Sequence, residues 1–475
     1  MAAMKDTVDP VSITPAQDQP RERLSRKELF FFSIGGVGEG LAFQSVSGMA
    51  VPILNLTLGI SPAYISMILS FRGLWDGFAD PFMGHFSDNF RSRWGRRRPF
   101  ILIGGLLVGL GMFLAWQIPS GLSHVGILTW FAVALLLLTS AQTIFCGPYG
   151  ALAIEMAPNY HERTRLVAWR SMFGMVSGVI GPWFFPFCLL GVFTSALQGV
   201  RWLSGILGLI CIITTILTFL NSKERMSTQA QEKEKLIPAM RSVASNIHFW
   251  RIIALYVIMI IMINVSNGFN LYVNIFYVFH GDKVAGARMA GIYGTMGTVV
   301  AALGIPLITW FSHRFQKHNA LRFAIGMMLV GQIATWFVMV PEYPYAQLVL
   351  PFCFSFGIAS VFTILSSMLF DVVDVDELLS GKRREGIFGA ACGWMMKSAG
   401  ALASALVGIL IVAVGFNVDN GAHQTPSTFF WMRFMISFMP AIMATSSLLL
   451  LIRYPLTEQR MNEIKSELEA RHRAA

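Results

Sequence analysis

The sequence has 475 residues, of which 55% are hydrophobic and only 13% are charged, and its mean hydropathy is +0.59. These values exclude an ordinary soluble globular protein and predict a membrane protein. The net charge of +10 would also suit a nucleic-acid-binding protein, but the positions of the basic residues argue against that class, as described below.

Windows of at least about 18 mostly apolar residues predict an all-α protein with twelve transmembrane helices. In chain order they cover residues 29–55, 61–87, 98–118, 126–155, 164–190, 202–221, 251–279, 286–314, 320–340, 345–372, 385–414 and 427–453. A long polar segment separates six helices from six, so we expect two six-helix bundles with a substrate site between them. The expected parts are a tail (1–28), the N-terminal bundle (29–221), a linker (222–250), the C-terminal bundle (251–453) and a second tail (454–475).

The basic residues are distributed unevenly along this pattern. Lys and Arg concentrate in both tails and in alternate loops, such as the loop RSRWGRRR at 91–98, whereas the other loops hold only Arg201, Lys283 and Arg288. This asymmetry predicts a multi-pass protein of the cell membrane with both termini in the cytoplasm. It also explains the positive charge by topology and by contact with anionic lipid of the bilayer, so no nucleic-acid partner is expected.

The second predicted helix carries three ionisable residues, Arg72, Asp76 and Asp80. Their spacing of i, i+4 and i+8 puts them on one stripe of a helix. Acids within a membrane usually belong to an ion or substrate pathway, and two carboxylates on adjacent turns suit a monovalent cation or a proton. The alternative is a structural ion pair with Arg72. We favour the cation site, because one arginine cannot neutralise both acids.

Three other ionisable residues lie deep in predicted helices, namely Glu39, Arg170 and Lys397. Lys397 has no acidic partner within its own helix. We therefore expect it either to neutralise the aspartate pair from the other bundle or to contact an anionic or hydroxylated substrate. Isolated charges in a bilayer are costly, so pairing among these groups is required.

The seventh predicted helix carries Asn264, Asn267, Asn270 and Asn274, of which the last three face one way. Amides both donate and accept hydrogen bonds, which matches the hydroxyl groups of a sugar. We expect Asn267, Asn270 and Asn274 to line a cavity; the alternative is hydrogen bonding between helices.

Charged residues also gather at the predicted cytoplasmic ends of the helices. Asp88 and Asp371 lie near the basic residues Arg96 and Arg384. These groups are candidates for ion pairs between the bundles that form in one state and break in another. Together with Arg72 and Lys397 they form the expected set of coupling and gating residues. The alternative is a solvated rim. The glycine run GGVGEG at 35–40 predicts close helix packing rather than a phosphate loop, because no strand precedes it.

The sequence lacks the features of an enzyme: it has no nucleophile–base set, no cluster of metal ligands and no phosphate loop. The five cysteines show no CxxC spacing and are expected to be reduced. No cofactor is expected apart from a coupling ion. A non-transporting sensor would usually append a soluble domain, and the tails here are short.

Several blocks together resemble the glycoside–pentoside–hexuronide:cation symporters of the major facilitator superfamily, the melibiose permease group. The blocks are WDGFADPFMG at 75–84, RSRWGRRRP at 91–99, EMAPNYHERTR at 155–165, DVVDVDE at 371–377 and GKRREG at 381–386. The resemblance covers about residues 30–450 and implies the major facilitator fold.

The resemblance also implies site residues. Asp76, Asp80 and Thr143 match a cation site, and Arg170 and Lys397 match basic residues at the sugar and coupling site. The acids that grip a galactosyl group in melibiose permease correspond to Gly40, beside Glu39, and to Cys146, and its stacking tryptophan corresponds to Gly150. A galactoside is therefore not expected, and an acidic sugar is conceivable. The substrate-binding set is Glu39, Cys146, Tyr149, Arg170, Asn267, Asn270, Asn274 and Lys397.

These inferences predict a monomeric symporter that couples Na⁺ or H⁺ to the uptake of a sugar or sugar derivative by alternating access. A rival cargo is a lysophospholipid or another amphiphile, because related symporters move such lipids. A non-transporting sensor is the alternative from another class.

Overall fold

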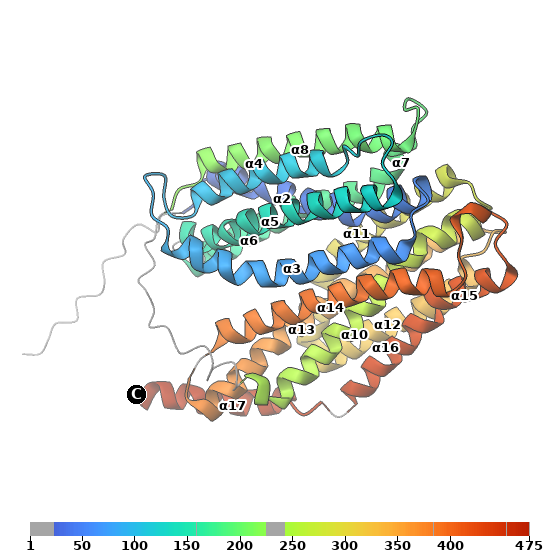
Figure 1. Ribbon diagram of the computed structural model, residues 1–475. Helices are drawn as coiled ribbons and strands as arrows, with labels where there is room; N and C mark the ends of the chain where they lie inside the picture. The colour runs from blue at the N-terminus through green and yellow to red at the C-terminus, as the bar shows by residue number, and fades with distance from the viewer. Residues whose placement is uncertain (1–22, 158, 225–242, 383, 453, 475) are drawn as a thin grey trace, which may run out of the picture.

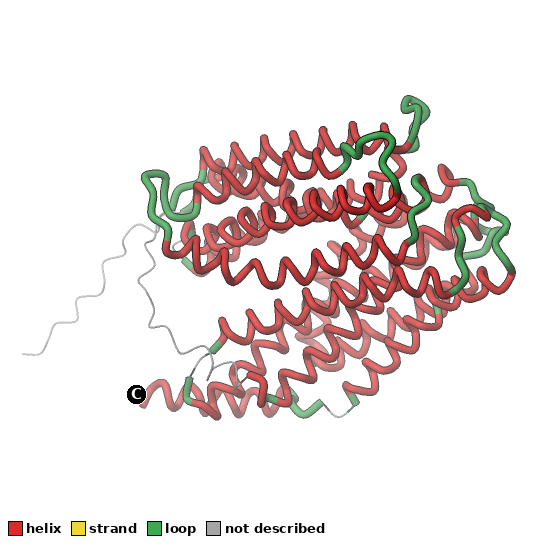
Figure 2. Tube along the Cα trace, in the orientation of Figure 1, coloured by secondary structure: helices red, strands yellow, loops and turns green. Residues whose placement is uncertain are grey.

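The computed structural model describes residues 23–474 except 158, 225–242, 383 and 453. These residues form helices and connecting loops and contain no strand (Figure 2). Most of the expected N-terminal tail and of the linker lie outside the described residues.

Six membrane-spanning segments form the N-terminal bundle, and some consist of consecutive short helices. They are α1 (Arg26–Ser33) with α2 (Gly35–Ser47) and the π-helix η1 (Pro52–Thr57); α3 (Pro62–Asn89); α4 (Arg98–Ala115); α5 (His124–Met156); α6 (Tyr160–Ile180) with η2 (Gly181–Trp183) and α7 (Phe184–Cys188); and α8 (Ala196–Asn221).

Six further segments form the C-terminal bundle. They are α10 (Ile247–Tyr272) with the π-helix η3 (Val273–Val278); α11 (Lys283–Phe315); α12 (Lys317–Val338); η4 (Ala346–Val349) with α13 (Leu350–Ser380); α14 (Glu385–Ala413); and α15 (Pro426–Ile436) with α16 (Phe438–Leu451). A short 3-10 turn, η5 (Val418–Asn420), precedes α15, and α17 (Glu458–Ala474) follows the last segment.

Eleven of these segments are long and apolar enough to cross a membrane. The twelfth is α3, whose hydropathy is lowered by Arg72, Asp76 and Asp80. The prediction of an all-α membrane protein with twelve transmembrane helices in two bundles is therefore confirmed. In Figure 1 the α17 helix lies at the end of the molecule where α3, α5 and α8 finish. We call this the basic end, and the other the opposite end.

The glycine run in α2 packs against its neighbours, as the sequence predicts. A Cβ at Gly35 would lie 2.8 Å from Thr218 Oγ1 of α8, and one at Gly36 would lie 2.9 Å from the carbonyl oxygen of Arg170 in α6. Only glycine permits these approaches. The run therefore holds α2 between α6 and α8.

The two bundles meet closely at the opposite end. Tyr272 donates a hydrogen bond to Asn55 Oδ1 at 2.8 Å, and Lys283 Nζ donates to the carbonyl oxygen of Leu56 at 2.7 Å. Trp183 Nε1 donates to Thr295 Oγ1 at 2.7 Å. These bonds join the first segment to the seventh and eighth, and the fifth to the eighth.

Toward the basic end the bundles separate along α3 and α14. A Cβ on Gly73 would lie 3.0 Å from Ala401, and one on Gly77 would lie 3.5 Å from Trp394. Beyond them, a Cβ on Gly84 or Gly389 would meet nothing within 4 Å. The described structure is thus closed at the opposite end and open at the basic end.

Candidate functional site

The aspartate pair lies halfway along α3 and is bound by a lysine of the other bundle. Lys397 Nζ lies 2.8 Å from Asp76 Oδ2 and also forms an ion pair with Asp80. Because α3 and α14 belong to different bundles, this ammonium group joins the two halves at mid-depth. The side chains are 30% exposed for Asp76, 46% for Asp80 and 34% for Lys397, so the cluster is open on one side.

This cluster includes the expected threonine. Thr143 Oγ1 of α5 donates to Asp76 Oδ1 at 3.3 Å. The two carboxylates and the hydroxyl supply oxygen ligands of the kind that a hard monovalent cation requires, and the ammonium group of Lys397 lies where such a cation would bind.

Arg72 does not pair with the acids on its own helix. Its Nε donates to Thr139 Oγ1 at 3.2 Å, and its Nη2 donates to Gln142 Oε1 at 3.0 Å. This arginine therefore links α3 to α5 through neutral partners. The alternative of a structural ion pair between Arg72 and the aspartates does not describe this conformation, because Lys397 is the basic residue that pairs with them.

Sequence reasoning missed Thr139 and Gln142. Both are buried and lie on α5, within four residues of Thr143. Polar residues at this helical spacing in an otherwise apolar span are a signal that could have identified them.

A second ion pair lies within the N-terminal bundle. Arg170 of α6 donates to both carboxylate oxygens of Glu39 on α2, at 2.7 and 2.8 Å. The guanidinium carbon of Arg170 lies 4.6 Å from the centroid of the Tyr149 ring. Tyr149 is buried and donates through its hydroxyl to the carbonyl oxygen of Phe32 at 2.7 Å. Its ring stacks on Phe32 and Phe145 at centroid distances of 4.7 and 5.3 Å, so the expected substrate contact of Tyr149 is not open in this conformation.

The packing of the neighbouring residues explains why the acid that binds Arg170 is at position 39 and not at position 40. A Cβ at Gly40 would lie 2.8 Å from Ser177 Cβ of α6, so this position belongs to the helix contact. Gly150 leaves room beside Arg170, because a Cβ there would lie 3.6 Å from Nη1. Cys146 is partly buried on α5, on the same side of the helix as Thr143.

The asparagines of α10 do not form one open face. Asn267 is exposed and, with Asn270, lines a small cavity beside Tyr293 and Gln332. Asn274 is fully buried, accepts a hydrogen bond from Gln347 Nε2 at 2.8 Å and donates to the carbonyl oxygen of Asn270. The alternative of hydrogen bonding within the bundle therefore describes Asn274, which contacts no open space.

At the basic end the described ion pairs stay within their own bundles. Arg96 and Arg97 pair with Glu155, Arg97 lies 2.8 Å from Asp88, and all four residues are in the N-terminal half. In the other half Lys317 lies 2.8 Å from Asp371, and Arg384 lies 3.7 Å from Asp376. The sequence did not reveal Glu224, which accepts backbone hydrogen bonds from Arg96 and Arg97 at 2.9 and 2.8 Å.

The family model for MFS/sugar transport proteins matches residues 31–458. The chain belongs to the glycoside–pentoside–hexuronide:cation symporter family of the major facilitator superfamily. It is therefore a multi-pass membrane transporter and not an enzyme, and at the level of its family it is a cation-coupled sugar symporter.

The chain is also similar over most of its length to individual proteins of known name or structure. The chain is 23% identical over 460 residues to a glucuronide carrier protein homologue of Escherichia coli, covering 95% of this chain and 97% of that one. It is 24% identical over 489 residues to a sphingosine-1-phosphate transporter of Xenopus tropicalis, covering 95% and 92%. A solved structure of a D-xylose–proton symporter covers 90% of this chain and 97% of its own, with 13% identity and a TM-score of 0.61.

Proposed function

We propose that this symporter binds its coupling cation between Asp76 and Asp80 and moves a sugar or sugar derivative through the space between the bundles. The observation that carries this proposal is the ion pair of Lys397 with both acids, because it makes the occupancy of one site depend on the relative position of the two bundles.

In the proposed cycle Lys397 acts as a competitor of the cation. With the site empty, the ammonium group of Lys397 offsets part of the negative charge of the two carboxylates and holds α14 against α3. A bound cation takes the place of that ammonium group and frees Lys397 either to move with its bundle or to contact the substrate. The cation thus shifts the equilibrium between conformations by its differential affinity for them.

The proposed substrate site lies beside Arg170. The Glu39–Arg170 pair and, from the other bundle, the exposed amide of Asn267 offer hydrogen-bond donors and acceptors to a hydroxylated ligand. Glu39 and a substrate would compete for the same guanidinium group. We assign the basic end to the cytoplasm, because Lys and Arg concentrate there. We further propose that the protein works as a monomer embedded in the lipid bilayer.

The test uses proteoliposomes containing the purified protein. Uptake of radiolabelled mono-, oligo- and acidic saccharides is measured with an inward Na⁺ gradient, with an inward H⁺ gradient and with neither. We expect one saccharide class to accumulate under one of the two gradients. Saccharide uptake that is unaffected by both gradients would contradict cation coupling at this site.

A second candidate cargo is an amphiphilic lysolipid, and the similarity to a sphingosine-1-phosphate transporter favours it. A lysolipid that accumulates under the gradient while the saccharides neither accumulate nor compete would replace the sugar in this proposal. It would leave the cation site unchanged.

A further inference from the structure

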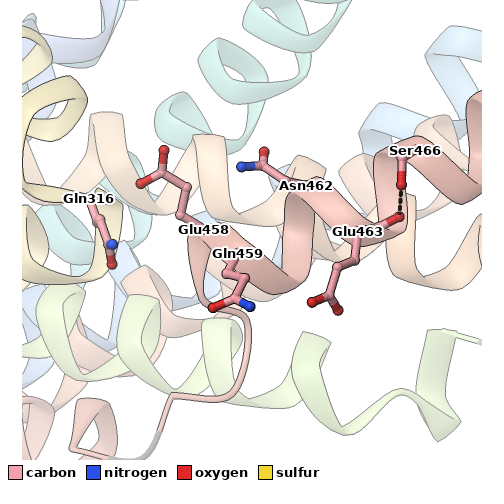
Figure 3. Close-up of a pocket in the computed structure, with 6 residues that line it drawn as sticks. All are labelled: Gln316, Glu458, Gln459, Asn462, Glu463 and Ser466. Carbon is pink, nitrogen blue, oxygen red and sulfur yellow. Dashed lines mark hydrogen bonds between the residues drawn. The ribbon is translucent and has the colours of Figure 1, made fainter.

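A second cavity lies far from the aspartate pair, where α17 crosses the basic ends of α11, α12 and α13. Its volume is about 370 Å³. Figure 3 shows the adjoining groove, in which Gln316 lies near the start of α17, with Glu458 and Asn462 on that helix. These three residues line both the groove and the cavity.

The α17 helix is firmly attached beside this cavity. Its residues Met461, Ile464 and Leu468 are buried in the core of the C-terminal bundle. At the far end of the helix, Arg471 donates to the carbonyl oxygen of Leu378 at 2.7 Å, and His472 lies 2.9 Å from Glu377. The cavity is therefore walled by helices that are packed together.

One wall carries a polar group without a partner. Tyr454 lines the cavity and is 9% exposed, and its buried hydroxyl has no hydrogen-bond partner among the described residues. Burial raises the pKa of Tyr454, and the nearby Asp371 raises it further, so the hydroxyl stays protonated. Buried hydroxyl groups are normally satisfied, so this one indicates an absent acceptor.

The hydrogen-bond donors that line the cavity favour an anion as that acceptor. Lys465, His313 and His318 line the cavity, and within the described part of the chain none of the three forms a hydrogen bond or an ion pair. Of the two lining acids, Asp371 already binds Lys317 through both oxygens at 2.8 Å. Glu458 is the other lining acid. Lys465 and the imidazoles of His313 and His318 therefore supply more hydrogen-bond donors to the cavity than Glu458 can bind.

The inner part of the cavity is apolar. Ile308 of α11 and Ile364 and Met368 of α13 line it, and both helices are membrane-spanning. The cavity lies at the end of those helices, at the depth of lipid headgroups. A ligand with one anionic and one apolar part matches this lining better than a free anion does.

We propose that this cavity binds the headgroup of an anionic phospholipid. The phosphate accepts hydrogen bonds from Tyr454, Lys465 and the two imidazoles, and the glycerol and first acyl carbons lie against Ile308, Ile364 and Met368. The bound lipid joins α17 to α11–α13. This site is independent of the cargo and of the cation site.

The test measures thermal unfolding of the delipidated full-length protein in detergent, with added phosphatidylglycerol, phosphatidylcholine or inorganic phosphate. We expect phosphatidylglycerol to raise the Tm at lower concentration than phosphatidylcholine. Tyr454→Phe and Lys465→Gln should each weaken this response about tenfold, as expected for a lost hydrogen bond to a charged group.

The matched control is Arg473→Gln, since Arg473 is on the same helix, its side chain is 82% exposed and it lies outside the cavity. It should respond like the unaltered protein. The lipid-free Tm of each variant shows whether it is folded. Equal phosphatidylglycerol responses in all folded variants would overturn the proposal. An equal effect of phosphatidylcholine, or full replacement of the lipid effect by inorganic phosphate, would also overturn it.

Discussion

Replacement of Lys397 by glutamine tests the competition between the ammonium group and the coupling cation. Lys397 contacts both Asp76 and Asp80. In Lys397→Gln the two carboxylates lose their positive partner, so an added cation no longer has to displace it. We therefore expect the apparent cation affinity to increase while transport fails, because the link between the bundles is lost.

The magnitude follows from the exposure of the pair. Hydrogen bonds between charged groups contribute about 1.5–3 kcal/mol, but these side chains are 30–46% exposed, and solvent reduces the contribution of such pairs. About 1–2 kcal/mol for both contacts corresponds to about 5- to 30-fold in cation affinity.

The assay is cation-induced stabilisation of the purified protein, measured by titration with NaCl and, separately, with pH, with choline chloride as the ionic-strength control. Lys223→Gln is the matched variant, because Lys223 is exposed and lies outside the membrane-spanning segments. Lys397→Gln with cation affinity equal to or weaker than that of Lys223→Gln would refute the reasoning.

Two further predictions concern packing and the closed end. Gly40→Ala should lower the free energy of unfolding by about 1–3 kcal/mol, because the added Cβ would lie 2.8 Å from Ser177 Cβ. Gly84→Ala is the control and should leave stability unchanged, because its added Cβ would meet nothing within 4 Å. Equal Tm values for the two variants would contradict this prediction. Tyr272→Phe removes the hydrogen bond to Asn55 between the bundles, which contributes about 1 kcal/mol. The opposite end should therefore open more often. In a background without the native cysteines, labelling of a Ser66→Cys reporter by an impermeant maleimide should increase about fivefold. Tyr277→Phe, which has no such bond among the described residues, is its control, and equal labelling would contradict the role of Tyr272 in closure.

The sequence predicted the helices and the acidic stripe because both depend on local periodicity. An apolar run of sufficient length must span the bilayer, and residues at i, i+4 and i+8 must share a face. The packing of the glycine run followed from the same reasoning.

Contacts between distant segments were harder to predict. Lys397 had no acidic partner within reach on its own helix, which indicated a partner elsewhere but left open whether that partner was the aspartate pair or a substrate. Arg72 was expected near the acids, yet it binds Thr139 and Gln142, because neutral oxygens satisfy a guanidinium group as well. Asn274 shares a helix face with Asn267 but is buried, since only the packing of neighbouring helices decides which part of a face is covered.

The residues of α17 were expected only as a cytoplasmic tail. Its buried residues Met461, Ile464 and Leu468 have helical spacing, so a search of the tail for amphipathic periodicity would have found it. The partner surface on the C-terminal bundle could not be predicted, because it is formed by segments far apart in the sequence.

The most direct test of the central claim compares gradient-driven uptake with exchange in proteoliposomes containing Asp76→Asn or Asp80→Asn. The account predicts that either variant loses accumulation against a gradient yet retains measurable substrate binding or counterflow, because the substrate residues are intact. Full concentrative uptake by both variants would contradict the assignment of the cation site.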